Sequence, residues 1–352
     1  KSLLQTGDGQ YAALIHEQKT GSTIVMFDRK GDRFTEKKLN SSMFDMVAFP
    51  GNKGYVLAGI NHPGDLIVQV ADKKMNPGNT SMVYSNVYDP GYHFTNLHAA
   101  VSLNCDEIGI VANMVNDAGD CNIWFQKADI SGKPVVARGK TFKYVGFKTA
   151  SQLIATQSGE FAVIGGYQQD MSSPGEMMLG MVGTDGTGKI HPMRARQKLT
   201  GCDIVEMPSG NFEVLAARES PGNPDFHELS LKLVDREINP MNCEIDLVGL
   251  MRSSDFNMFP PRVLETEEGF ILLSHVYNGT DRDIALLWID KGGSILLRKE
   301  EIKRPGDQFG TALLRESDGS LVITGAERTS GDLDAILIKT DRTGRYSEQT
   351  NN

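Results

Sequence analysis

The feature of this sequence that most limits its possible folds is a unit of about 52 residues that recurs seven times along the chain. Each unit has an apolar run that opens with an aromatic or aliphatic residue, and a second apolar run that ends at an aspartate. The opening residues are Tyr11, Tyr55, Ile108, Phe161, Phe212, Phe270 and Leu321, and the aspartates are Asp28, Asp72, Asp129, Asp185, Asp235, Asp290 and Asp341. Because the two markers stay in phase throughout, we interpret the chain as one repeat array.

The aspartates predict tight turns. Five of them have glycine three residues later, namely Gly31, Gly132, Gly188, Gly293 and Gly344, whereas Asp72 and Asp235 are followed by Asn76-Pro77 and Asn239-Pro240. Aspartate at the first position of a type I turn accepts hydrogen bonds from the backbone ahead of it, and glycine tolerates positive φ at the fourth. Each turn is therefore expected to reverse the chain between two strands.

The apolar runs predict strands, because short runs rich in Val, Ile and Leu and bounded by Gly and Asp are typical of sheets. Each unit has a further short run before its opening residue, and a more polar run after its aspartate turn. Four antiparallel strands that cannot bury both faces alone stack as blades in a ring. We therefore predict an all-β, seven-bladed β-propeller with four antiparallel strands per blade. It would be a single domain with blades at about 1–40, 41–94, 95–148, 149–199, 200–258, 259–308 and 309–352.

Composition excludes some classes of protein. The formal net charge of −9 argues against nucleic acid as the main ligand, because phosphate binding requires clustered Lys and Arg. No run approaches 18 apolar residues, so no membrane-spanning helix is expected. The four cysteines form no CxxC pair and give no zinc or redox signature, which leaves disulfides and buried free thiols open, with free thiols favoured. The start at Lys1, without Met or a signal peptide, suggests a processed or trimmed N-terminus.

Loop lengths indicate which face of the propeller is functional. The loops between second and third strands, and those that lead into the next blade, emerge on one face, and the aspartate turns emerge on the other. Long connections such as 168–176 and 218–228 occur almost entirely on the first face. Binding residues are often carried on variable loops of a rigid scaffold, so we expect function on this long-loop face.

Three groups of residues could bind a ligand, but each has a simpler explanation. His62, His93 and His98 could bind a metal, although no carboxylate or Cys lies at ligand spacing beside them, and scattered loop histidines are favoured. Segments 116–120, 281–283 and 332–334 resemble calcium loops. They lack the full EF-hand pattern, and Asp is a routine turn residue. We therefore predict no cofactor, with structural calcium left open.

Basic and aromatic residues near the blade connections allow two interpretations each. Arg194, Arg196, Lys198, Lys303 and Arg304 could hold a carboxylate or phosphate, but a solvated rim is favoured. Phenylalanines just before inner strands favour packing between blades over a ligand-stacking platform. They are Phe44, Phe94, Phe256 and Phe309.

The segments DAILIKTDRTGR, DIALLWIDKGGS and TIVMFDRKGDR resemble the aspartate-turn β-propeller repeats of bacterial secreted and cell-surface proteins. The resemblance implies the propeller fold and an extracytoplasmic setting. That family shares no catalytic motif, so no site can be transferred. The blade-docking Trp of quinoproteins, the sialidase Asp-box and the Gly-His and Trp-Asp pairs of WD40 repeats are absent, and the kelch double Gly occurs only at 165–166.

We therefore predict a non-catalytic binding or assembly module outside the cytoplasm, which engages a protein or a glycan on the long-loop face. The residues expected there are Tyr92, His93, Arg196, Asp255 and Asp307. One alternative is a carbohydrate-active hydrolase or lyase at the channel mouth, which requires converging carboxylates, His and Arg with perturbed pKa values. The other is a structural subunit of a larger assembly, which requires apolar patches on the outermost strands. The binding interpretation requires a broad surface with exposed aromatics.

Overall fold

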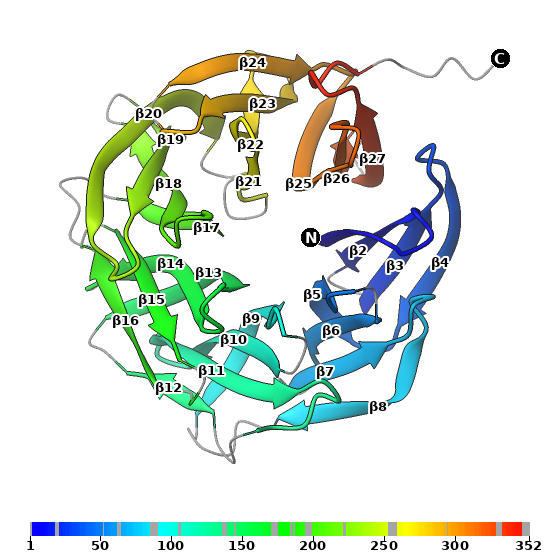
Figure 1. Cartoon of the computed structure of the whole chain (residues 1–352), viewed down its shortest axis with the longest axis vertical. Coiled ribbons are helices and arrows are strands. Elements are labelled where there is room, and N and C mark those ends of the chain that lie inside the picture. Colours follow the sequence, from blue (N-terminus) through cyan, green and yellow to red (C-terminus); the bar gives the residue numbers. More distant parts are fainter. Residues whose placement is uncertain are drawn as a thin grey trace.

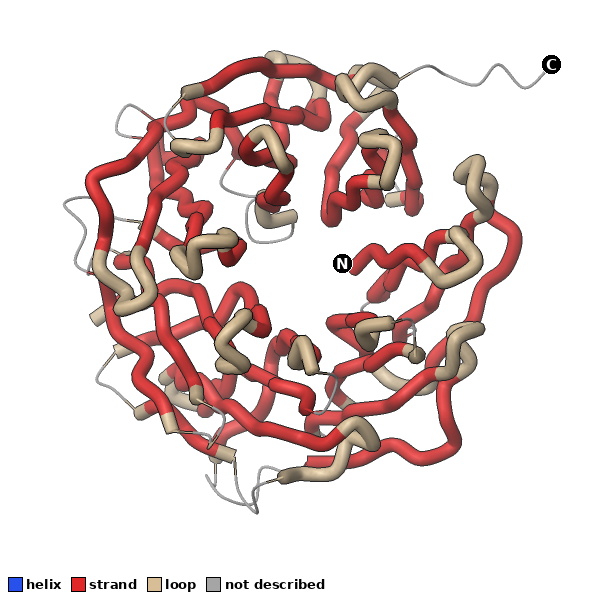
Figure 2. The backbone as a smooth tube through the Cα atoms, viewed as in Figure 1, coloured by secondary structure: helices blue, strands red, loops and turns tan. Residues whose placement is uncertain are grey.

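The chain forms a ring of seven antiparallel sheets around a central axis, and none of the described residues is helical (Figures 1 and 2). The computed structural model describes residues 2–17, 21–51, 53–61, 65–84, 91–104, 107–135, 139–143, 146–169, 175–183, 185, 187–193, 199–220, 223–252, 259–293, 295–328 and 333–346. Every sheet is one continuous stretch of chain. Its strands follow in sequence order from the centre outward, which confirms the predicted seven-bladed propeller.

Six sheets have four strands, and the seventh has three within the described residues. Blades one to three contain β1 (Ser2–Gln5), β2 (Tyr11–Glu17), β3 (Gly21–Phe27), β4 (Arg33–Leu39); β5 (Ser42–Ala48), β6 (Tyr55–Ile60), β7 (Leu66–Ala71), β8 (Pro77–Tyr84); β9 (Tyr92–Val101), β10 (Glu107–Asn116), β11 (Cys121–Asp129) and β12 (Lys140–Phe142). Blades four and five contain β13 (Phe147–Ala155), β14 (Phe161–Gln168), β15 (Glu176–Val182), β16 (Gly188–Met193); β17 (Thr200–Glu206), β18 (Phe212–Ser220), β19 (Asn223–Val234) and β20 (Pro240–Arg252). Blades six and seven contain β21 (Arg262–Thr266), β22 (Gly269–Tyr277), β23 (Arg282–Asp290), β24 (Leu296–Ile302); β25 (Asp307–Arg315), β26 (Leu321–Arg328) and β27 (Asp334–Thr340).

The inner strands of three blades begin earlier than the expected blade limits. β9 starts at Tyr92, β13 at Phe147 and β25 at Asp307, against expected limits at 95, 149 and 309. Polar and exposed residues at these strand starts interrupt the apolar pattern, and β-bulges shift the register in β13 and β25. Apolar alternation therefore marks only the second half of each inner strand.

The core of the molecule lies between blades, not within them. Seven clusters of buried side chains each join two neighbouring sheets. The residues that open the second strands are central to this packing, and Tyr11, Phe161 and Phe270 are almost fully buried. Because both faces of a second strand are covered by neighbouring blades, the ring buries apolar surface that no single sheet could bury.

Six of the seven aspartate turns have the hydrogen bonds expected from the sequence. In blade four the N–H of Gly183 instead donates to the carbonyl oxygen of Thr187, and Gly188 begins β16 without the positive φ expected there. In blade one, Asp28 Oδ1 accepts from the backbone N–H groups of Lys30 (2.8 Å) and Asp32 (2.9 Å), and Gly31 has φ of +95°. Where glycine is missing, Met75 takes the positive φ of +58°, and the Asn76 amide donates to Asp72 Oδ2 at 2.9 Å. The side chain of the asparagine thus strengthens a turn that lacks its glycine.

Inner-strand bulges bring backbone unusually close to the second strands. Opposite the bulge in β25, a Cβ atom on Gly325 would stand 1.9 Å from the carbonyl oxygen of Phe309. Gly325→Ala is therefore expected to shift the backbone and to destabilise the fold by about 2 kcal/mol, measured by urea unfolding. Gly175→Ala is the control, because its nearest neighbour would be the Thr200 hydroxyl at 3.6 Å. Equal losses in the two variants would contradict the clash.

The ring closes where blade seven meets blade one, through a junction that is more polar than the others. Its apolar cluster has six buried residues in the described chain, against eight or more at every other junction. Lys339 Nζ instead donates to Glu316 Oε2 (2.8 Å), to the Tyr11 hydroxyl (2.9 Å) and to the carbonyl oxygen of Arg29 (2.8 Å). The Tyr11 hydroxyl also donates to Glu316. Polar contacts therefore support the closing junction.

Candidate functional site

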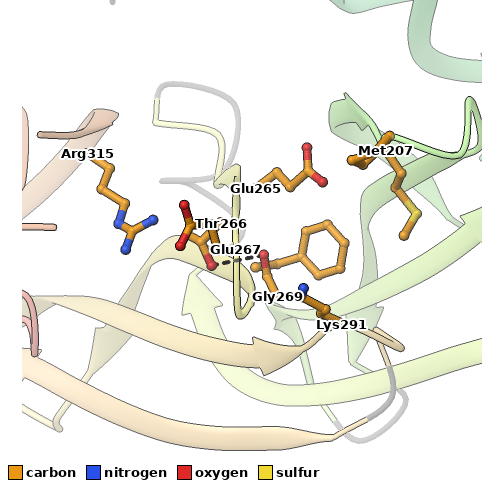
Figure 3. A pocket seen from close by; sticks show the side chains of 9 residues that line it. Met207, Glu265, Thr266, Glu267, Gly269, Lys291 and Arg315 are labelled. Atoms are coloured by element: carbon orange, nitrogen blue, oxygen red, sulfur yellow. Dashed lines mark hydrogen bonds between the residues drawn. The ribbon is translucent and has the colours of Figure 1, made fainter. Parts of the chain in front are cut away.

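The two faces of the ring differ in what they carry. The hairpins between first and second strands and the aspartate turns lie on one face, which we call the turn face. The remaining connections lie on the opposite, long-loop face. A pocket of about 540 Å³ opens on the turn face (Figure 3), opposite the face that loop length indicated.

The pocket is built by three successive blades. Figure 3 shows Met207 of blade five on one side, Arg315 of blade seven on the other and the 265–269 hairpin of blade six between them. The lining residues are Met207, Pro208, Glu265, Thr266, Glu267, Gly269, Phe270, Lys291 and Arg315. They come together because the inner strands β17, β21 and β25 end side by side on this face.

The pocket combines apolar and oppositely charged lining residues. Phe270, which is 2% exposed, and Met207 are apolar, and the exposed Lys291 and Arg315 side chains carry positive charge. Burial raises the pKa of the half-buried Glu265, and the Lys291 ammonium acts in the opposite direction. Such a site can hold a ligand that has both apolar and charged groups.

The 265–269 hairpin is held in a fixed shape. The Thr266 hydroxyl donates to the Gly269 carbonyl at 3.1 Å, a bond drawn in Figure 3. Gly269 has φ of +145°, and a Cβ atom there would lie 2.1 Å from the carbonyl oxygen of Ile289. Only glycine fits this close approach, which sets the depth of the pocket beside Phe270.

A buried glutamate, Glu213, lies between blades five and six. Glu213 of β18 is 1% exposed, and neither carboxyl oxygen has a hydrogen-bond partner among the residues that the structure describes. One of these oxygens stands 2.4 Å from the position that a Cβ atom on Gly293 would occupy. Burial, together with the negative charge of Asp290, raises the pKa of Glu213 to about 8. Glu213 does not line the pocket, but it contacts the turn that carries Lys291.

The predicted residues on the long-loop face do not converge. Tyr92 and His93 begin β9 in blade three, with Tyr92 half-buried and His93 exposed, whereas Asp307 begins β25 in blade seven. Arg196 and Asp255 lie outside the described residues. Three of the five predicted residues are thus placed, and they belong to blades that are not neighbours in the ring.

Asp307 is held by two arginines at the long-loop end of blades six and seven. Its Oδ2 lies 3.0 Å from Arg282 Nη1 and 3.8 Å from Arg328 Nη1, and its Oδ1 accepts from the backbone N–H of Arg282 at 3.1 Å. Both guanidinium groups also lie within about 6 Å of the Phe309 ring centre. This arrangement ties blade seven to blade six and leaves one positive charge in excess.

The other residues singled out from the sequence have structural contacts where they are described. Phe94 packs against Trp124 of its own blade and belongs to the apolar cluster shared with blade two, and Phe309 of blade seven stacks on Phe259, which precedes β21 of blade six. His98 lies 3.9 Å from Asp45, and Asn116 hydrogen-bonds within its own turn. His62, Phe256, Asp332 and residues 194–198 lie outside the described part of the chain.

The described cysteines are free thiols, and the described residues form no metal-binding group. Cys121 and Cys202 are free thiols, and burial raises the pKa of both. Cys105 and the side chain of Cys243 are not described. Within the described ranges, no three His, Cys, Asp or Glu side chains lie close enough to hold a metal ion. The same ranges contain no helix that could cross a bilayer.

Six inner strands carry a polar residue that was not predicted from the sequence. These residues share one register position, opposite the residue three after the one that opens the second strand, and are Ser2, Asp45, His98, Gln152, Asp203 and Arg262. Ser2 Oγ donates to Asp45 Oδ1 (2.7 Å), and Asp45 Oδ2 accepts from the N–H of Ala99 in the next blade (3.0 Å). Asp203 Oδ2 accepts from the N–H of Val263 at 2.9 Å. The available signal was a polar residue at the same position of the short inner run in six of the seven units; the seventh has Ala312 there.

Comparison with known proteins shows likeness in shape only. No protein-family model matches the sequence, and no curated protein matches it. A puromycin hydrolase mutant complexed with PGG is similar to this chain at 12% identity and a TM-score of 0.59, over 97% of this chain and 53% of its own. The β-propeller domain of the Trilobed protease from Pyrococcus furiosus, described as having an open velcro topology, is 12% identical to this chain. The TM-score is 0.52, and the match covers 100% of this chain and 97% of that domain.

A third structure is of similar size. The β-propeller domain of Cps50 (Swd1) from Myceliophteria thermophila is 11% identical, with a TM-score of 0.53 over 92% of both chains. These likenesses establish the fold. At such low identities they carry no site or activity, and the chain spans about half the length of the puromycin hydrolase chains.

Proposed function

We propose that this propeller is a non-catalytic binding module whose turn-face pocket holds a peptide segment of a partner protein. The observation that carries the proposal is the pocket lining, in which the apolar residues Phe270 and Met207 lie among the charges of Glu265, Lys291 and Arg315. A volume of about 540 Å³ is in the range of ordinary ligand sites, and a peptide supplies both apolar and charged groups.

A peptide is favoured over a glycan by the aromatic side chains. Sugars stack on exposed rings, but the Phe270 ring at this pocket is buried. Exposed aliphatic side chains instead occur at the edge of blade six, where Ile295, Leu296 and Leu297 are 57%, 43% and 58% exposed. Apolar patches of this kind are typical of protein contacts, and they also fit the alternative of a subunit in a larger assembly.

Binding is favoured over catalysis by how the carboxylates are held. A general acid or base is normally oriented by hydrogen bonds in a site that excludes water. Glu267 is exposed, and neither Glu265 nor Glu267 has a described hydrogen-bond partner that would fix its orientation. The raised pKa of Glu265 follows from burial and does not require a catalytic role. The extracytoplasmic location expected from the turn repeats remains part of this proposal.

The test compares the two faces of the ring. Decapeptides selected from a random library on the natural protein are expected to bind Lys291→Ala/Arg315→Ala at least tenfold more weakly, as measured by fluorescence anisotropy. Lys189→Ala, an exposed lysine in blade four, serves as the control. Undiminished binding to the pocket variant, combined with loss in Tyr92→Ala/His93→Ala, would reject the pocket in favour of the long-loop face. Failure to select any saturable binder would count against a peptide-binding role.

A further inference from the structure

Among the described residues, no strand pairs with the outer edge of the third strand of blade seven. In each of the other six blades an outermost strand pairs with the third strand, and these outermost strands are β4, β8, β12, β16, β20 and β24. Within the described residues β27 pairs only with β26, in a regular register without a bulge. Its seven residues contain no proline, so a row of backbone N–H and C=O groups is available to another strand.

The side chains of β27 are also less covered than those of the other third strands. Ala335, Ile336 and Leu337 are half-buried, whereas residues 284–286 at the same register positions of β23 are at most 2% exposed. Ile336 packs on the side of blade six and Leu337 on the side of blade one. An added strand would complete both contacts and bury further apolar surface.

The other blades show what such a strand must supply. At one register position, each outer strand places an apolar residue opposite its third strand, and the six residues are Leu39, Tyr84, Phe142, Met193, Leu247 and Ile302. The third-strand residue at this position in blade seven is Ala335. A strand that covers β27 therefore needs an apolar residue opposite Ala335 and alternation along its length.

The charged residues near the edge of β27 indicate the sign of the charge expected on the partner. The turn at residues 28–31 lies next to Leu337 and Lys339, and residues 28–31 and 334–345 together contain five Lys and Arg but three Asp and Glu, in a chain with a net charge of −9. Lys30, Arg342 and Arg345 are exposed and have no ion pair within the described part of the chain. This local excess of positive charge favours an acidic segment.

We propose that the outer edge of β27 binds an extended, acidic segment of a partner protein by strand addition, with an apolar residue opposite Ala335. Main-chain hydrogen bonds would supply affinity, and the Ala335 position and the flanking cations would supply selectivity. This surface is on the perimeter of the ring and does not depend on the pocket proposed above.

The probe is a peptide made from this chain's own outer strand. The labelled decapeptide of residues 294–303, with Arg298 and Lys299 replaced by glutamate, keeps the apolar residue at Ile302 and adds acidic charge. Anisotropy titration of the whole chain is expected to show binding at least tenfold tighter than for the same peptide with proline at positions 297 and 299, because proline removes the backbone N–H groups that donate to the ladder. Lys30→Glu/Arg342→Glu should weaken binding about tenfold, whereas Lys189→Glu should not.

Amide hydrogen exchange locates the bound strand. The peptide is expected to slow exchange at alternate amides of β27 and to leave β23 unchanged. Protection at another strand, or affinity unchanged by Lys30→Glu/Arg342→Glu, would overturn the proposal. So would β27 amides that are as protected as those of β23 in the free protein, because a segment of the same chain would then already cover the edge.

Discussion

Between pH 5 and pH 9 the natural chain is expected to lose roughly 4 kcal/mol of stability that Glu213→Gln retains. The pKa of Glu213 is about 8 in the folded protein, because of burial and then the charge of Asp290, against 4.5 in its ordinary state. The unfolded chain releases the proton from about pH 4.5 upward while the folded chain keeps it. The free energy of unfolding therefore falls as pH rises, and levels off above about pH 8.

The measurement is urea unfolding at five pH values from 5 to 9, followed by tryptophan fluorescence. Glutamine resembles the protonated carboxyl in size and does not titrate. The unfolding free energy of Glu213→Gln should therefore change little with pH over this range, apart from contributions shared with the natural chain. Glu237→Gln is the matched control, because Glu237 is exposed in the turn after β19. Parallel pH profiles for the natural chain and Glu213→Gln would show that Glu213 titrates normally.

Replacing Lys339 with alanine is expected to destabilise the protein by about 3 kcal/mol, because it leaves the partly buried Glu316 without its cation and removes hydrogen bonds to Tyr11 and Arg29. Burial alone would raise the pKa of Glu316, but hydrogen bonds from Lys339, Tyr11 and Ser320 lower it overall. This contribution is therefore present at neutral pH and is lost as pH falls through the lowered pKa of Glu316.

A double-mutant cycle with Glu316→Ala distinguishes the ion pair from simple loss of packing. The double variant is expected to lose less unfolding free energy than the sum of the losses in the two single variants, because removal of Glu316 also removes the unpaired charge. Thermal unfolding and limited proteolysis at the junction of blades seven and one provide the measurements. Lys38→Ala on the exposed face of β4 is the control. Additive losses would mean that Lys339 and Glu316 act independently.

The ring could be predicted because its signals are local and repeated. Turn aspartates such as Asp28 and strand-opening residues such as Tyr11 act within their own blade, and each copy supports the others. The starts of β9 and β25 were missed because bulges and polar residues there break the alternation that marks a strand.

The pocket and Glu213 could not be predicted from alternation or loop length. Met207, Glu265 and Arg315 are about 50 residues apart in sequence and meet only because three turns end side by side. Glu213 occupies a second strand, where a polar residue next to Phe212 would normally face solvent. In this ring both faces of a second strand are covered by other blades, so alternation does not distinguish inside from outside. Loop length indicates which connections vary between blades. The presence of a pocket depends instead on the distance between the turns of neighbouring blades, which loop length does not show.

The continuity of each sheet has a consequence for how the chain could be rearranged. No blade borrows a strand from a distant part of the described sequence, so a cut in a connection between blades separates no strand from its sheet. Opening the two-residue link between β4 and β5, and connecting the chain after β27 to the chain before β1 with a linker, would give a circular permutant. In that molecule the Lys339 contacts would become internal to the chain, and the weakest point of the ring would move to the new termini.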